Sequence, residues 1–269
     1  MFTAKEKEGE GVVTQTYLER IGISEVKDAN LQTLHELQEQ HLYTVPFENI
    51  DIQIGKPIIL DPDTIYDKVV LNRRGGFCYE LNSLFGSLLR KLGFQVTMIS
   101  GRVSTPSGGF GPEHDHMALI VCVDDHDYLV DVGFGDSCRV PLPLSGDKRE
   151  DISGSYRIRP KHGHPGQYKL EKRINKRWLT EYLFRTTPKK LEDFTLMCQH
   201  HQISPTSTFL RNWICSIATP EGRISVSDDF LTITQNGKKN KLRVRDKEHR
   251  KILIQKYFSI QIQESSIKE

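Results

Sequence analysis

The sequence of 269 residues lacks the features that are typical of membrane, nucleic-acid-binding or secreted proteins. It contains no apolar run of about eighteen residues, which is the length that a membrane-spanning helix needs. Its formal net charge is only +2, so its electrostatics give no reason to expect a nucleic-acid partner. The first residues, MFTAKEKEGEGVV, are charged and lack the apolar core of a secretory signal. We therefore expect a globular, cytoplasmic protein without membrane or nucleic-acid partners.

Cysteine is also scarce, and its spacing argues against two common roles. The five cysteines are far apart and form no C-x-x-C pair: Cys78, Cys122, Cys138, Cys198 and Cys215. An odd and scattered set is typical neither of a disulfide framework nor of a zinc ribbon. Most of these thiols are expected to be reduced and buried as small hydrophobic side chains. Any reactive cysteine must be recognised by its surroundings.

Three parts of the chain differ in their hydrophobic pattern. Residues 1 to about 12 read as a mobile charged tail, after which helical spacing dominates as far as Gly93. Short β patterns follow, and the last part mixes both kinds. We predict domains over residues 1–94, 95–190 and 191–269. No strand–helix–strand series carries a glycine-rich phosphate turn, which argues against a Rossmann or P-loop enzyme.

Two helices stand out in the first part. Asn30 is the expected N-cap of one, which Pro46 ends. The other begins near Cys78 and ends at Gly93, a typical C-terminal glycine. Its apolar residues recur at helical spacing: Leu81, Leu84, Phe85, Leu88, Leu89 and Leu92.

The second and third parts contain the strand patterns. Six close runs predict a small antiparallel sheet or barrel: FQVTMISGRV, HMALIVCV, DYLVDVGF, SYRIRP, QYKLEKRI and RWLTEYLF. The segment TTPKKLEDFTLMCQHHQISP is expected to hold a helix. Beyond it, further strands are joined by an Asn236-Gly237 hairpin turn, and KEHRKILIQKYF is the predicted last helix.

Cys78 lies in the stretch NRRGGFCYELN, where a helix is expected to begin. A helix N-terminus, a nearby cation and a histidine each lower the pKa of a thiol and favour the nucleophilic thiolate. Arg73 and Arg74 offer the cation, and the two glycines that follow would let a substrate carbonyl approach the sulfur. Free N–H groups of Cys78 and Tyr79 would stabilise an oxyanion. A buried cysteine beside a simple turn explains the stretch equally well.

A base and its orienting carboxylate are predicted in two consecutive strands. His116 begins a strand that is apolar on both faces, and Asp131 lies among apolar residues of the next. A buried carboxylate without a partner is costly, so Asp131 needs a specific donor. If the loop has two residues, Asp131 lies opposite Ala118, on the same face as His116 and about 7–8 Å away along the diagonal. An odd loop would put the two side chains on opposite faces.

A metal site is the alternative for the histidines. His114 and His116 share a strand face, but no further ligands cluster beside them, so zinc is not favoured. His200 and His201 are expected on a polar surface.

Several of these segments together resemble the arylamine N-acetyltransferases. The matching motifs follow one another over nearly the whole chain from about residue 15: PFENI, RGGFCYELN, HMALIV, VDVGFG, SPTSTF and TPEG. The resemblance implies ping-pong transfer of acetyl from acetyl-CoA to an arylamine or arylhydrazine, with no metal. It implies Cys78 as the nucleophile, His116 as the base and Asp131 as the residue that orients it.

The resemblance also implies roles outside the triad. Glu48 would form a buried ion pair with Arg74, and Asn82 would hydrogen-bond near Asp131. The substrate pocket would include Phe47 and Phe134, for which plain core packing is the alternative. Thr206 would contact CoA, as it does in some members, and otherwise would cap a turn.

The sequence thus predicts an α+β fold with an N-terminal helical bundle, a central antiparallel β-barrel and a C-terminal α/β lid, around a Cys-His-Asp core like that of cysteine proteases. The site would lie at the seam between these parts. The rival functions are a Cys-His-Asp amide hydrolase, a transglutaminase-like acyltransferase and a binding protein with a degenerate site. The sequence does not indicate the oligomeric state.

Overall fold

The computed structural model describes residues 13–136 and 138–262, so the predicted N-terminal tail lies outside the described residues. Residues 13–20 are helical. The helices that follow are α2 Leu31–Thr44, α3 Ile50–Gln53, α4 Pro62–Tyr66, the π-helix Asp67–Leu71, α5 Cys78–Lys91, the 3-10 helix Leu191–Phe194, α6 Thr195–Ile203, α7 Thr208–Arg211 and α8 Lys247–Phe258.

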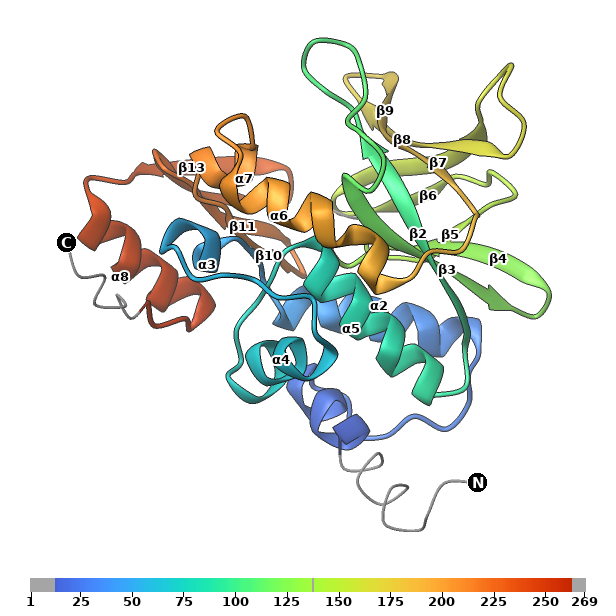
Figure 1. The fold of residues 1–269 in the computed structure, drawn as a ribbon, viewed down its shortest axis with the longest axis horizontal. Coiled ribbons are helices and arrows are strands. Elements are labelled where there is room, and N and C mark those ends of the chain that lie inside the picture. Colours follow the sequence, from blue (N-terminus) through green and yellow to red (C-terminus); the bar gives the residue numbers. More distant parts are fainter. Residues whose placement is uncertain (1–12, 137, 263–269) are drawn as a thin grey trace.

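An eight-stranded antiparallel sheet, drawn from green to yellow, lies at one side of the molecule (Figure 1). Its strands are β2 Gln95–Val103, β3 His116–Val123, β4 His126–Val130, β5 Leu142–Pro143, β6 Arg149–Asp151, β7 Gly154–Pro160, β8 Gln167–Ile174 and β9 Arg177–Arg185. Their order is β5-β4-β3-β2-β9-β8-β7-β6, and β5 also lies against β7, so the sheet is a nearly closed barrel. The predicted barrel is confirmed, although the sequence pattern had not revealed the short strands β5 and β6.

A second, five-stranded sheet pairs a short strand from the N-terminal part of the chain with four strands from the C-terminal part. Its strands are β1 Phe47–Glu48, β10 Cys215–Thr219, β11 Gly222–Val226, β12 Phe230–Gln235 and β13 Lys238–Arg243, in the order β1-β10-β11-β12-β13. Helix α8 packs on one face of this sheet against β11. The predicted hairpin turn is confirmed, since Asn236 and Gly237 have φ angles of 48° and 77° between paired Gln235 and Lys238.

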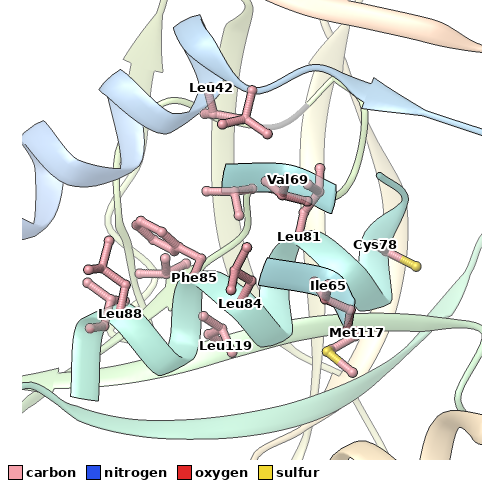
Figure 2. Packing of buried hydrophobic residues seen from close by; sticks show 14 of the residues in the cluster. Leu42, Ile65, Val69, Cys78, Leu81, Leu84, Phe85, Leu88, Met117 and Leu119 are labelled. Atoms are coloured by element: carbon pink, nitrogen blue, oxygen red, sulfur yellow. The ribbon is translucent and has the colours of Figure 1, made fainter. Parts of the chain in front are cut away.

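Helix α5 lies at the centre of the largest hydrophobic core. Its predicted stripe packs on β3 and on the helices around it, as Figure 2 shows for Leu81, Leu84, Phe85 and Leu88 near Leu119. Burying each such side chain contributes about 1.5–3 kcal/mol. The buried stripe therefore fixes how α5 lies across the barrel, and with it the position of Cys78.

The ends of the predicted helices follow their capping residues. Asn30 accepts the Thr33 N–H at 2.9 Å and begins α2, which ends at Thr44, before Pro46. Gly93, with φ +93°, follows the last residues of α5 as predicted. Among residues 13–136 and 138–262, no helix combines the length and apolarity needed to cross a membrane.

Candidate active site

Cys78 is the first residue of α5 and is 2% exposed. The carboxylate of Glu80 reaches back and accepts the Phe77 N–H at 3.1 Å, which stabilises the start of the helix. As in any α-helix, the first N–H groups have no partner within the helix. The backbone N–H groups of Cys78 and Tyr79 thus belong to this first turn, where the sequence predicted an oxyanion site.

The hairpin β3–β4 brings His116 and Asp131 together. Asp124 and Asp125 form a two-residue turn with φ angles of 49° and 59°, so Val123 pairs with His126. This register continues to Leu119 and Val130, which sets Asp131 beyond the last pair on the face of His116. His116 Nε2 lies 2.8 Å from Asp131 Oδ2, so of the two alternatives the even loop is the one that the structure contains.

Four donors surround the buried carboxylate of Asp131. Besides His116, Tyr182 donates its hydroxyl to Oδ2 at 2.9 Å, while Asn82 Nδ2 and the Gly133 N–H donate to Oδ1 at 3.0 and 2.9 Å. Burial alone would raise the pKa of Asp131, but His116 and these hydrogen bonds together hold it below its usual value. The carboxylate is therefore ionised and holds the imidazole by Nε2, which leaves Nδ1 for proton transfer.

Asn82 connects the helix of Cys78 to both strands of the hairpin. It lies one turn after Cys78, is fully buried, and donates to the Met117 carbonyl at 2.7 Å as well as to Asp131. Its Oδ1 accepts the Val132 N–H at 3.0 Å. The predicted contact with Asp131 is confirmed.

A glycine lets the hairpin approach the nucleophile closely. A Cβ added to Gly133 would lie 2.7 Å from the Cα of Cys78, so only glycine fits there. The end of β4 thus packs directly on the first turn of α5.

Cys78 and His116 both line a cavity of about 780 Å³ between the barrel, the five-stranded sheet and α6–α7. The predicted pocket residues Phe47 and Phe134 are in its wall, and the Phe134 ring lies 5.2 Å from that of His116. Thr206 also lines the cavity, where its hydroxyl lies 2.8 Å from that of Ser204. The structure thus brings Cys78, His116 and the three predicted contact residues around one space.

Comparisons with known proteins identify the family. A family model described as N-acetyltransferase matches residues 30–267. Arylamine N-acetyltransferase 1 of Homo sapiens is 34% identical over 227 residues, which cover 77% of this chain and 78% of the human protein. The chain belongs to the arylamine N-acetyltransferase family. It is an acetyltransferase, and the resemblance seen in its motifs is confirmed.

Two solved structures of arylamine N-acetyltransferases share the fold. The Bacillus cereus protein has a TM-score of 0.86 and 28% identity, covering 93% of this chain and 99% of its own; its reported triad is Cys-His-Glu. The Mycobacterium marinum protein, in complex with CoA, has a TM-score of 0.84 and 28% identity, covering 91% and 92%. In the present member of the family, the carboxylate beside the histidine belongs to Asp131.

The acidity of the thiol differs from the sequence-based prediction. Burial raises the pKa of Cys78 well above its usual value; a hydrogen bond from the Met117 backbone opposes this effect, and the charge of Asp131 adds to it. The prediction that the helix N-terminus and His116 produce a thiolate omitted this loss of solvation. In this arylamine N-acetyltransferase burial therefore disfavours the thiolate, and the thiol needs a base to become a nucleophile.

The two arginines before the glycines differ in their surroundings. Arg74 Nη2 lies 2.7 Å from Glu48 and 3.0 Å from Asp51, so the predicted ion pair is confirmed and extended. Arg73 is exposed, and the structure gives no function for its side chain. Neither guanidinium is placed to activate the thiol.

A buried lysine extends the Glu48–Arg74 ion pair to α5. Lys68 Nζ lies 2.8 Å from Glu80 and 2.9 Å from Asp51. Because Glu80 also holds the first turn of α5, the network supports the backbone of Cys78. The charged residues Asp51, Lys68 and Glu80 were not predicted from the sequence, because no local signal marked them.

The glycines before Cys78 do not open a path for substrate. A Cβ on Gly75 would lie 2.0 Å from the Pro46 carbonyl oxygen, and one on Gly76 would lie 2.8 Å from Glu80 Oε2. The cavity wall, as far as it is described, contains neither glycine. They allow the chain to pack on itself, and the predicted role in substrate approach is wrong.

His201 is buried, which contradicts its predicted place on a polar surface. Its ring stacks on Tyr79 with 6.0 Å between centroids, and its Nε2 lies 3.3 Å from the Asp115 carbonyl oxygen. It lines the cavity together with the exposed His200. The polar appearance of QHHQ concealed this contact because α6 is covered on one face only.

The remaining cysteines and acids form no cluster of ligands. All five cysteines are free. In the described part of the chain, no group of three or more histidine, cysteine or acidic side chains is arranged to hold a metal ion.

Proposed function

We propose that this chain transfers an acetyl group from acetyl-CoA to an arylamine or arylhydrazine through a thioester on Cys78. The observation that carries the proposal is the position of His116, which lines the same cavity as Cys78 and lies 2.8 Å from the buried carboxylate of Asp131. The names of its relatives as arylamine N-acetyltransferases, and the CoA complex of one of them, support the substrate classes. Acetyl-CoA is the cosubstrate, and the proposed chemistry uses no metal.

In the first half-reaction, His116 removes the proton from Cys78 as its sulfur attacks the acetyl carbonyl. Asp131 stabilises the imidazolium that forms. The N–H groups of Cys78 and Tyr79 donate to the oxyanion. The bond between the acetyl carbon and the CoA sulfur then breaks, and His116 returns its proton to that sulfur.

In the second half-reaction, the amine nitrogen attacks the thioester on Cys78. His116, neutral again, accepts the proton that the nitrogen loses. The carbon–sulfur bond breaks, the amide leaves, and the sulfur recovers its proton from His116. The exchange of one thioester for another is nearly balanced, whereas amide formation is favourable and drives the reaction forward.

The cavity supplies the binding groups. Phe47 and Phe134 provide an aromatic wall for the acceptor, and the hydroxyls of Thr206 and its neighbours can donate to CoA. If Phe134 shapes the acceptor site, Phe134→Ser will change the relative kcat/KM values of a panel of arylamines and hydrazines. Unchanged selectivity would assign Phe134 to core packing alone.

Glu48, Arg74 and Asn82 have supporting roles, because they hold the elements that carry the triad. We also propose that the three parts, residues 1–94, 95–190 and 191–269, act as helical domain, barrel and lid. A reduced, cytoplasmic location suits an enzyme that depends on a free thiol.

Mass spectrometry tests the proposal directly. Incubation with acetyl-CoA should add one acetyl group to Cys78, and an added arylamine should remove it with formation of the amide. Cys78→Ser should prevent the adduct, whereas Cys198→Ser, which changes another buried free cysteine, should retain it. Absence of an adduct, together with cleavage of a peptide or amide substrate, would instead establish a Cys-His-Asp hydrolase.

A further inference from the structure

In the described part of the chain, Arg139 is the largest side chain that is fully buried, with 1% of its surface exposed. Its Nη1 donates to the Thr219 carbonyl at 2.5 Å, and its Nη2 donates to the Gly222 carbonyl. Nη1 also donates to the Tyr43 hydroxyl at 3.2 Å, and Nε donates to the Ser153 hydroxyl at 3.1 Å. A buried guanidinium that loses one of these acceptors keeps an unpaired donor, which is costly. The four oxygens are therefore held in place around Arg139.

The two carbonyls belong to the turn TPEG, which joins β10 to β11. Thr219 and Gly222 are its paired ends in the strand register. A Cβ added to Gly222 would lie 2.1 Å from the Thr234 carbonyl oxygen, so the turn packs closely on β12. The planar guanidinium of Arg139 binds both carbonyls at once, which the single ammonium of a lysine does not reproduce. The turn is thus fastened to the segment between β4 and β5, from which Arg139 extends.

A second arginine crosses the same interface in the opposite direction. Arg223 of β11 donates to the Gly135 carbonyl, in the segment between β4 and β5, and at 3.0 Å to the Ser216 hydroxyl of β10. A Cβ added to Gly135 would lie 3.5 Å from the Phe47 ring, so the segment also contacts β1 there. The segment and the β10–β11 hairpin are therefore joined at two points, one for each arginine.

These two elements form part of the wall of the catalytic cavity. The segment contributes Gly133, Phe134, Gly135 and Asp136, and the hairpin contributes Ser216, Arg223, Ser225 and Val226. The Phe134 ring lies 5.2 Å from that of His116. Arg139 lies behind this wall, outside the described lining. The distance between the two elements therefore decides how much room an acceptor ring has beside Phe134.

We propose that Arg139 is a positioning residue, which sets the width of the acceptor site by holding the TPEG turn against the segment that carries Phe134. The inference rests on the acetyl transfer proposed above and names a residue that limits which acceptors fit. The hydrogen bonds around His116 and Asp131 are made by other residues, so the triad should survive replacement of Arg139. Loss of the guanidinium should then change the choice of acceptor more than the attack on acetyl-CoA.

The test compares two acceptors of different width, 4-methylaniline and 4-cyclohexylaniline, whose amino groups have similar reactivity. The ratio of their kcat/KM values does not depend on how much of the enzyme is folded, because both values scale with that amount. Arg139→Gln should raise the ratio of the wide to the narrow acceptor about tenfold, because the wall moves outward when its fastening is lost. Acetyl-Cys78 formation at saturating acetyl-CoA should stay within about threefold of the wild-type rate. Arg139→Lys should raise the ratio less, because its ammonium holds one carbonyl.

Arg157→Gln is the matched control. Arg157 lies 2.7 Å from Glu171 and stacks on Trp178 at 4.1 Å, and none of the three is in the described cavity lining. Its replacement also removes a partly buried guanidinium from the protein, but it should keep the wild-type ratio.

The contrary outcomes are distinct. An unchanged ratio in Arg139→Gln, or a shift toward the narrow acceptor, means that Arg139 only supports folding and overturns the proposal. If Arg139→Gln does not fold, Arg139→Lys decides in the same way. An equal shift in Arg157→Gln would trace the effect to lost stability and would also overturn the proposal. If the wild type forms no acetyl-Cys78, the acetyl transfer itself fails, which differs from an unchanged ratio in a variant whose Cys78 is acetylated.

Discussion

Replacing Asn82 with alanine should weaken the connection between the helix of the nucleophile and the hairpin of the base. The fully buried amide makes three hydrogen bonds of 2.7–3.0 Å, to Met117, Asp131 and Val132. Each contributes roughly 1 kcal/mol net, and the change leaves a buried carbonyl and a buried N–H unpaired. We expect the free energy of unfolding to fall by about 3 kcal/mol.

The same variant should also slow acylation of Cys78. Asp131 loses one of its four donors, and the first turn of α5 loses its fixed distance from the hairpin. A small displacement of reacting groups costs about ten- to hundredfold in rate. Urea unfolding gives the stability, and the rate of acetyl-Cys78 formation by quenched mass spectrometry gives the chemistry.

Asn82→Asp is the matched control, since it preserves size and the acceptor for Val132. It places a second carboxylate beside Asp131, where two like charges oppose each other and raise the pKa of the pair. Acylation should be slow at neutral pH and recover partly as the pH falls. A loss of less than about 0.5 kcal/mol in Asn82→Ala, with an unchanged acylation rate, would refute the proposed connection.

Three further predictions concern the core and the ion network. Burial lowers the pKa of His41 to about 3, so between pH 6.5 and 3 only the unfolded chain binds this proton. As the pH falls through this range, the free energy of unfolding therefore decreases by about 1.4 kcal/mol per pH unit. His41→Leu should flatten the dependence of the urea midpoint on pH between pH 7 and 5, and a profile parallel to that of the wild type would contradict this. In Gly75→Ala the new Cβ would lie 2.0 Å from the Pro46 carbonyl oxygen, so urea unfolding should show a free energy of unfolding lower by about 3 kcal/mol. Stability equal to that of the wild type would show that the loop moves to accommodate the methyl group. Lys68→Met leaves buried Glu80 without its cation and should lower the free energy of unfolding by about 3–5 kcal/mol in urea. An unchanged free energy of unfolding would mean that the Glu80 carboxyl is protonated in the variant.

Much of the backbone follows from local patterns. The apolar repeat from Leu81 to Leu89 and the glycine at 93 predict α5 because helical spacing and a left-handed C-terminal residue are local properties. The hairpin turns at 124–125 and 236–237 are equally local. By contrast, β1 is recognised only through its pairing with β10, since two residues carry no periodic signal.

The candidate triad was predictable because each member has a recognisable local setting. Cys78 begins a helix, and the strand register brings His116 to Asp131. Tyr182, the fourth donor to the carboxylate, comes from a strand more than fifty residues away and has no such setting. The hydrogen bond from its hydroxyl to Asp131 can be recognised only in the folded barrel.

The sequence by itself determined the long helices and strands, the three candidate triad residues and the family. Only the tertiary structure decided the environment of each charge. It showed that burial raises the pKa of Cys78, and that the glycines beside it accommodate the protein's own chain. The reason is physical: periodicity and turn chemistry act between near neighbours, whereas solvation and electrostatic pairing depend on every group that folding brings close.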